Sequence, residues 1–297
     1  MRRLVLVLIV CAVISTGAVD APTATLSRER RVDNAYRQGL ARFGGGWIFS
    51  GTNGLWRTND DFDVEATNPS PIPTDLRARG YNRIGDVDVA GAYLYVPFEQ
   101  PDRARDEQVT ARFDAKTLRF VDSVTLTQHE NPFVAVDAHS GTAYSMDRTG
   151  GDEVLRYDLG GLRWRRLPSL HLRRRVENVR GLDVDAGFMY LSTSDPENTL
   201  YRVDLGSGAV IDLGSAGRAG EEGSGIDVTP LATGRIHTLT IGADRTSVRL
   251  GDYRVPSSRR SGTAEQAIIA ITIAATLVAT IVIVMLTRRR RPKPTAQ

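Results

Sequence analysis

Carboxylate and amide side chains recur along the middle of the chain, each shortly before an apolar run. The set comprises Asn82, Glu130, Asn131, Glu177, Asn178 and Glu222, and His129 adjoins it as a further candidate ligand-binding residue. Carboxylate and amide oxygens are the ligands that hard cations such as Ca²⁺ prefer. Among the four histidines, only His129 stands beside a member of this set, where it could act as a general acid or base. The set predicts a binding rim with Ca²⁺ as one candidate ion, although polar loop residues are also expected where no ligand binds.

No motif in the sequence identifies an enzyme. There is no His-Glu-x-x-His helix, no Gly-x-Ser-x-Gly elbow and no phosphate-binding loop, and the single cysteine is Cys11. Catalytic residues therefore stay unknown, and we expect a binding or scaffold module in preference to an enzyme.

A repeated unit positions these polar residues. The pairs Asp88 and Tyr95, Asp137 and Tyr144, and Asp183 and Tyr190 have the same seven-residue spacing, and a looser copy contains Asp227. A second series of aspartates lies further along each unit, at Asp114, Asp158 and Asp204. Aspartate at a strand end accepts hydrogen bonds from the next turn, which favours a structural role for both series.

Each period of 44 to 49 residues contains four short strand-like runs separated by turn residues. Such periods are typical of a β-propeller. Trp47 to Ser50 and Leu55 to Thr58 supply strands of a degenerate first unit. We expect an all-β fold with about five four-stranded blades, or six if residues 34–43 and the last segment contribute more. Trp47, Trp56 and Trp164 are expected to pack between blades.

The phrases "FVAVDAHSGTAYSMDR" and "GLDVDAGFMYLST" resemble the extracytoplasmic β-propellers with NHL-, YVTN- or quinoprotein-like repeats. The resemblance covers roughly residues 80–255 and concerns architecture only. That group includes binding modules, scaffolds and some metal-dependent hydrolases. A lactonase-like hydrolase that uses the Glu and Asn rim is the alternative function that the resemblance implies.

Both ends of the chain differ from its middle. Residues 1–21 combine Arg2 and Arg3, an apolar run and small residues at Ala18 and Ala21, which indicates a signal peptide cleaved after either alanine. Residues 267–287 carry no charge over a length that spans a bilayer as a helix. The basic tail at 288–297 follows and predicts a cytoplasmic C-terminus, and therefore a single-pass type I protein of the cell membrane.

The remaining segments complete the expected layout. They are an N-terminal segment at 22–42, a propeller ectodomain at 43–256 and a juxtamembrane stalk at 257–266. Two of the 38 basic residues lie in the signal and five in the tail, which leaves 31 against 34 acidic residues between them. This balance predicts no nucleic-acid partner. Arginine clusters at 163–166 and 173–175 could face an anionic envelope component, or form a solvated outer strand.

Overall fold

The computed structural model describes residues 23–100, 106–160, 163–228 and 234–255. All of these belong to the first of two units into which the chain divides, Met1–Val255 and Pro256–Gln297. The expected signal at 1–21, stalk at 257–266, membrane span at 267–287 and tail at 288–297 lie outside the described residues. Within the described part, no helix has both the length and the apolar character needed to cross a membrane.

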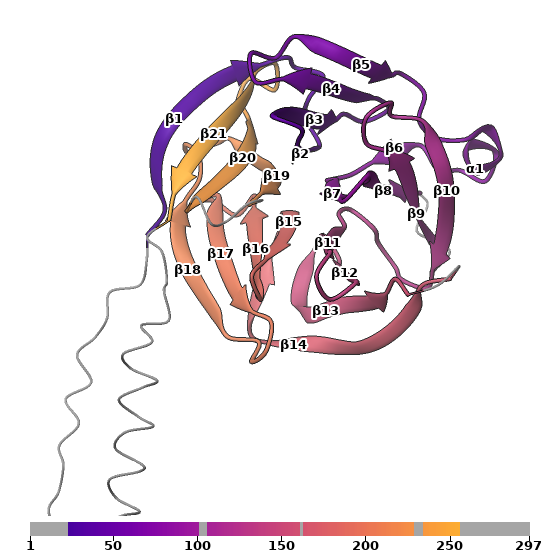
Figure 1. Cartoon of the computed structure of the whole chain (residues 1–297). Coiled ribbons are helices and arrows are strands. Elements are labelled where there is room, and N and C mark those ends of the chain that lie inside the picture. Colours follow the sequence, from indigo (N-terminus) through magenta and orange to yellow (C-terminus); the bar gives the residue numbers. More distant parts are fainter. Residues whose placement is uncertain (1–22, 101–105, 161–162, 229–233, 256–297) are drawn as a thin grey trace, which may run out of the picture. The chain divides into compact units, whose positions relative to one another are not determined.

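Five antiparallel sheets are arranged around a common centre, as blades of a β-propeller (Figure 1). Blade 1 contains β2 (Gly39–Phe43), β3 (Gly46–Ser50), β4 (Leu55–Asn59) and β5 (Val64–Asn68). Blade 2 contains β6 (Arg83–Ile84), β7 (Asp88–Ala90), β8 (Tyr93–Glu99), β9 (Gln108–Asp114) and β10 (Phe120–Leu126). Blade 3 contains β11 (Ala135–Asp137), β12 (Thr142–Ser145), β13 (Gly150–Asp158) and β14 (Arg165–Glu177). Blade 4 contains β15 (Val179–Asp185), β16 (Phe188–Thr193), β17 (Thr199–Asp204) and β18 (Val210–Ser215). Blade 5 contains β19 (Glu222–Asp227), β20 (Arg235–Ile241), β21 (Val248–Arg254) and β1 (Thr25–Val32).

The innermost strands close a ring around the centre. Contacts run from β2 to β7, β11, β15 and β19, and from β19 back to β2. The expected propeller of five four-stranded blades is thereby confirmed, with the innermost strand of blade 2 divided into β6 and β7, which both pair with β8. A short helix, α1 (Thr74–Ala78), connects blades 1 and 2 and buries Leu76 against both.

The first strand of the described residues completes the last blade. β1 pairs antiparallel with β21, from Thr25 opposite Arg254 to Val32 opposite Val248. The propeller therefore begins before residue 43, because the segment expected to precede it, 22–42, supplies β1 and most of β2. Residues 34–43 contribute the innermost strand of blade 1, so no sixth blade forms from them.

Hydrophobic side chains pack in five clusters within the described residues, one between each pair of neighbouring blades. Trp47 is 2% exposed between blades 5 and 1, and Trp56 packs against the same cluster. Trp164 packs against the cluster between blades 2 and 3. The prediction that the tryptophans pack between blades is confirmed.

The repeated aspartates occupy two different kinds of position. Asp88 lies opposite Tyr95 and Asp183 opposite Tyr190, but Tyr144 lies opposite Ala135, because the β11–β12 hairpin has two more loop residues. Asp137 instead accepts hydrogen bonds from His139 and Ser140 within that turn. Asp137 and Tyr144 therefore have the same sequence spacing as the other two pairs but do not lie opposite each other in the sheet.

Candidate functional site

The predicted rim residues lie near the face of the propeller on which the innermost strands begin. Glu130 is 3% exposed, and its Oε2 accepts a hydrogen bond of 2.6 Å from the backbone N–H of Arg148. The Arg148 guanidinium reaches Glu99, at the end of β8, at 2.5 Å. Glu99 also lies 3.5 Å from the guanidinium of Arg83, at the start of β6. One side of the channel mouth thus alternates acidic and basic side chains across blades 2 and 3.

The same alternation continues across blades 4 and 5. Arg180, in β15, lies 3.7 Å from Glu222 at the start of β19 and donates a 2.7 Å hydrogen bond to the Ser194 hydroxyl. Glu222 also pairs with Arg245 in the loop that follows β20. Burial lowers the pKa of Arg180, and the positive charges of Arg148 and Arg245 lower it further, whereas Glu130 opposes the shift.

We call this set the mouth ring; it comprises Arg83, Glu99, Glu130, Arg148, Arg180, Glu222 and Arg245. Four arginines stand against three glutamates, which leaves one positive charge in excess. Arginine presents a planar set of donors that suits carboxylate and phosphate groups. The ring can therefore receive an anionic group of a ligand or partner.

The other predicted rim residues do not join the mouth ring. Asn131 is fully buried and donates to the carbonyl of Val109 between blades 2 and 3. Asn178 has a φ of 53°, and its carbonyl accepts a hydrogen bond from the backbone of Ser194. Glu177 pairs with Arg175 on the exposed end of β14, and Asn82 lines a separate pocket on blades 1 and 2.

His129 lies in an acidic pocket of about 400 Å³ at the edge of blade 3. Its Nδ1 is 3.2 Å from Asp106, and Asp147 lines the same pocket. Burial and the charge of Glu130 raise the pKa of Asp147. The structure thus places Glu130 beside Arg148 and Glu222 beside Arg180 and Arg245 at the mouth, and His129 in a different pocket. Across the described residues, no three His, Cys, Asp or Glu side chains are grouped so that they could hold a metal ion.

Sequence reasoning missed the arginines of the mouth ring. Arg148 and Arg245 each stand in an Asp-Arg-Thr triplet, at 147–149 and 244–246, just after the second strand of their blades. The recurrence of this triplet could have indicated that an arginine stands at the same position in two blades. Arg83 and Arg180 carry no comparable sequence mark. Arg83 meets Glu99 through the pairing of β6 with β8 within blade 2, and Arg180 meets Glu222 of blade 5 only because the ring closes.

A single carboxylate closes the centre of the channel. Asp86, between β6 and β7, is 1% exposed and accepts backbone N–H groups of Leu40, Leu182 and Ile226 at 3.2 to 3.3 Å. These donors come from the innermost strands of blades 1, 4 and 5. Burial raises the pKa of Asp86 well above its usual value, although the backbone donors oppose this shift.

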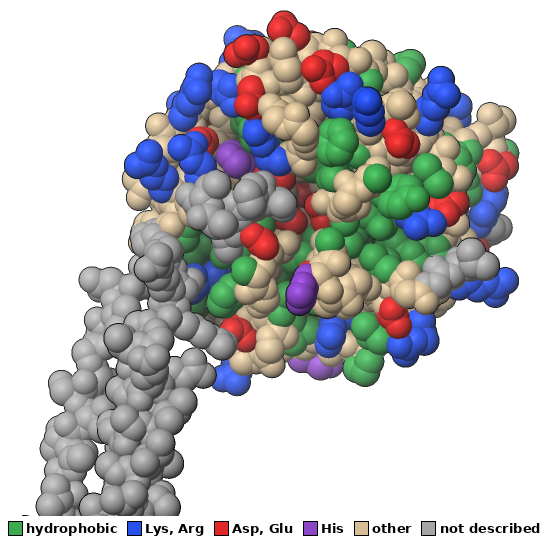
Figure 2. All heavy atoms as spheres, in the orientation of Figure 1, with side chains coloured by type: hydrophobic (Ala, Val, Ile, Leu, Met, Phe, Trp, Pro, Cys, Tyr) green, Lys and Arg blue, Asp and Glu red, His purple; other side chains and the backbone are tan. Residues whose placement is uncertain are grey.

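Three further aspartates link the innermost strands below this closure. Asp88 accepts the N–H of Val136 in blade 3 at 2.6 Å, Asp183 that of Val228 in blade 5 at 2.6 Å, and Asp227 that of Arg42 in blade 1 at 2.8 Å. Their role is structural, as expected, but these amides belong to neighbouring blades and not to the turn that follows each aspartate. Acidic side chains are visible near the centre of the face shown in Figure 2.

The central carboxylates repel one another. Burial raises the pKa of Asp88 to about 7, and the charge of Asp227 contributes. Burial also raises the pKa of Asp183 well above its usual value, with Asp88 and Asp227 adding to the effect. By contrast, the turn aspartate Asp114 has a lowered pKa because Thr117 donates hydrogen bonds to it. The centre of the propeller therefore favours protonated carboxyl groups.

The two arginine clusters lie on or beside the outer strand β14. Arg165 pairs with Asp158 at 2.7 Å, Arg173 donates to the carbonyl of Ser207, and Arg174 lies over the ring of Tyr201. These contacts belong to a solvated outer strand, which was one of the two expected roles.

No family model matches the chain, and no curated protein matches it. Among solved structures, the chain is similar to one in "Crystal Structure of Mitotic Checkpoint Complex", with 12% sequence identity and a TM-score of 0.44. The match covers 83% of this chain and 74% of that chain. The resemblance to NHL-, YVTN- or quinoprotein-like repeats stays a prediction. The propeller architecture itself follows from the strand pairing described above.

Proposed function

We propose that the chain is a membrane-anchored extracytoplasmic binding module that receives a ligand or protein partner of the cell envelope at the mouth ring. The observation that carries this proposal is the alternation of four arginines and three glutamates contributed by four blades. Arginine is enriched among the residues that dominate binding energy at interfaces. Arg180 is the expected anchor, because its partly buried guanidinium lies near two other cations.

The closed centre supports recognition at the mouth in preference to passage through the channel. Asp86 fills the space between the innermost strands and is held by donors from three other blades. A partner would therefore contact the ring and the loops around it. Side chains mounted on strands of a rigid scaffold suit such recognition.

The anchoring part of the proposal rests on the sequence of the two ends. Residues 1–21 have the order of a signal peptide, and residues 267–287 have the length and composition of a membrane span followed by arginines.

Site-specific photo-crosslinking in intact cells tests the binding function. A photoreactive residue replaces Glu177, which is exposed beside the mouth ring, and a control replaces Arg119, which is exposed on an outer turn of blade 2. We expect a discrete adduct from position 177 that disappears with Arg180→Glu and persists with Arg119→Glu. An adduct that is indifferent to Arg180→Glu, or equal from both positions, would refute the mouth ring as the binding surface.

Cysteine labelling tests the topology. Cys11 is the only cysteine and lies in the expected signal, so the mature chain is a cysteine-free background. Ala138→Cys in the exposed β11–β12 loop should react with a membrane-impermeant maleimide on intact cells, whereas Thr295→Cys should react only after lysis. The reverse labelling pattern would contradict the type I orientation.

A further inference from the structure

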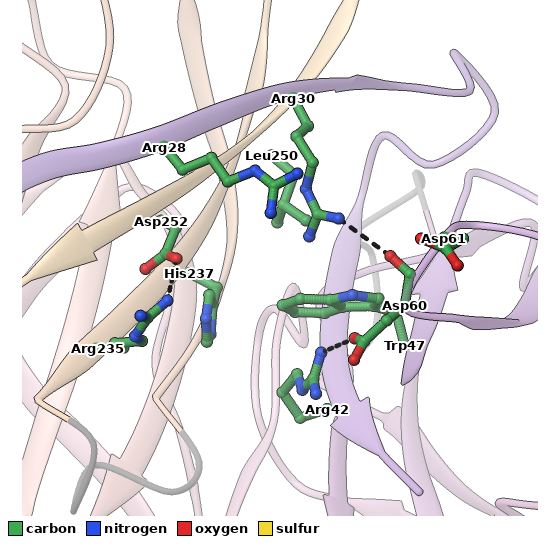
Figure 3. Close-up of a pocket in the computed structure, with 10 residues that line it drawn as sticks. All are labelled: Arg28, Arg30, Arg42, Trp47, Asp60, Asp61, Arg235, His237, Leu250 and Asp252. Carbon is green, nitrogen blue, oxygen red and sulfur yellow. Dashed lines mark hydrogen bonds and ion pairs between the residues drawn. The ribbon is translucent and has the colours of Figure 1, made fainter. Parts of the chain in front are cut away.

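A cavity of about 360 Å³ lies where the last blade meets the first, away from the mouth ring (Figure 3). Arg28 and Arg30 enter it from β1, Arg42 from β2 and Arg235 from β20. The Trp47 ring forms part of its wall and, in Figure 3, lies between Arg30 and Arg42. The cavity exists only because β1 closes the propeller by joining β21.

Two of the four arginines are already neutralised. Arg42 pairs with Asp60 at 2.6 Å, and Arg235 pairs with Asp252 at 2.5 Å. Each of these carboxylates therefore has a guanidinium partner within the cavity wall. The third carboxylate of the wall is Asp61, next to Asp60.

Arg28 and Arg30 have no carboxylate within ion-pair distance among the described residues. Arg30 donates to the backbone carbonyl of Asp60 at 3.0 Å and lies over the ring of Phe62. Burial lowers the pKa of Arg30 and the charges of Arg28 and Arg42 lower it further, whereas the charges of Asp60 and Asp252 oppose the shift. With four arginines and three aspartates in its wall, the cavity has one positive charge in excess, and the two arginines without an ion-pair partner in the described structure lie on the β1 side.

The Trp47 indole adds a buried donor. Trp47 is 2% exposed, and its Nε1 has no hydrogen-bond partner within the described part of the chain. Its ring is fixed by Arg42 at 4.4 Å on one face and by His237, whose ring centroid lies 4.9 Å away edge-on. An indole N–H can only donate, and a buried donor without an acceptor is unfavourable. A ligand that accepts a hydrogen bond from Trp47 and carries negative charge for the arginines would therefore suit this cavity.

We propose that this inter-blade cavity binds a phosphate group. Donors approach from two blades, with Arg28 and Arg30 on the β1 side and Trp47 on the blade 1 side. A tetrahedral oxyanion presents oxygens in several directions and can accept from both sides, whereas a carboxylate offers two coplanar oxygens. Guanidinium groups and buried N–H donors are the groups with which proteins bind phosphate.

The test uses the full chain in a non-ionic detergent, titrated with inorganic phosphate by calorimetry at constant ionic strength. Chloride and acetate serve as comparison anions. Arg28→Gln and Arg30→Gln should each weaken phosphate binding by at least about tenfold, because each removes a charge-assisted donor. Trp47→Phe keeps an aromatic ring but removes the N–H, and should weaken binding by a smaller factor.

Arg31→Gln is the matched control. Arg31 lies on the same strand as Arg30 and is exposed, and alternation along a strand turns its side chain to the other face. This variant should bind phosphate as the unmodified chain does. Binding of acetate as tight as that of phosphate, no phosphate binding at all, or an equal loss in Arg31→Gln would overturn the proposal.

The phosphate could belong to a soluble molecule or to a lipid head group. The full chain reconstituted in phosphatidylcholine vesicles, with and without phosphatidic acid, distinguishes these sources. If the head group is the ligand, phosphatidic acid prevents binding of added phosphate. If the ligand is soluble, added phosphate binds equally in both vesicles. Because Arg180 lies outside the cavity, Arg180→Glu should leave phosphate binding intact. The experiments therefore test phosphate binding in the cavity separately from partner binding at the mouth ring.

Discussion

The carboxylate of Asp86 lies where a side chain at Gly39 would begin. A Cβ on Gly39 would fall 2.3 Å from Asp86 Oδ1 and 2.5 Å from Asp86 Cα. Gly181 and Gly225 face the same carboxylate, with Cβ positions 2.7 and 2.6 Å from its oxygens. Three glycines on three innermost strands thus allow the backbone to approach the central carboxyl group closely enough to donate hydrogen bonds to it.

Gly39→Ala should destabilise the propeller by about 1–3 kcal/mol or more, because the added methyl group overpacks a site bounded by backbone atoms. Thermal and urea unfolding of the full chain measure this. Gly151→Ala is the control, since its Cβ would meet nothing closer than 3.8 Å and its φ is not positive. Equal stability of both variants would contradict the close packing around Asp86.

Stability should fall as the pH rises toward neutrality. The pKa of Asp88 is about 7 in the folded chain against an ordinary value of 3.8, so the folded state binds this proton more tightly than the unfolded state. The resulting stabilisation is complete below about pH 4 and is lost as the pH rises through about 7. The pKa values of Asp86 and Asp183 shift in the same direction.

Unfolding temperatures measured from about pH 5 to about pH 8 check this dependence. Asp88→Asn should flatten the profile, because it removes one of the titrating groups, whereas the exposed Asp152→Asn should leave it unchanged. A melting temperature that rises with pH across this range would show that the central carboxyl groups do not behave as argued.

Deletion of residues 25–32 should leave β21 with an open edge. Its unpaired backbone groups would promote association of chains, and the blade 5–blade 1 cluster would lose Val32. We expect a lower unfolding temperature and a larger species in size-exclusion chromatography. A synthetic peptide of residues 23–34 should restore both properties by strand addition, and a scrambled peptide should not.

Removal of divalent cations should leave the melting temperature unchanged. Glu130 and Glu222 already accept hydrogen bonds or ion pairs from Arg148, Arg180 and Arg245, so we expect EDTA to have no effect. Glu222→Gln should cost less than about 1 kcal/mol, because its ion pairs are partly exposed. Stoichiometric metal by elemental analysis, with a melting temperature that falls on its removal, would instead favour the lactonase-like alternative.

Asn178 should tolerate glycine better than alanine. Its φ of 53° lies in the left-handed region, which glycine adopts freely and asparagine more readily than alanine. Asn178→Ala should cost about 1 kcal/mol, and Asn178→Gly should be close to neutral. Equal destabilisation in urea unfolding would show that the side-chain amide matters more than the backbone conformation.

Part of the candidate site could be predicted from the sequence. The positions of Glu130 and Glu222 near the mouth follow from the repeat, because they precede the repeated aspartates Asp137 and Asp227 by seven and five residues. The role of Asn131 could not be predicted, since an asparagine before a strand can face either the channel or the interface between blades. In the structure it donates to Val109 of the neighbouring blade.

The sequence by itself determined the blade repeat, since strand alternation and turn residues act between neighbours along the chain. The turn role of Asp114 follows from this local pattern. The tertiary structure alone decided that β1 completes blade 5, that Ala135 and not Asp137 matches Asp88, and that Asp86 closes the centre. The pairing of Thr25 with Arg254 joins residues far apart in the chain. The convergence of side chains from different blades exists only once the ring closes, so no local spacing could specify it.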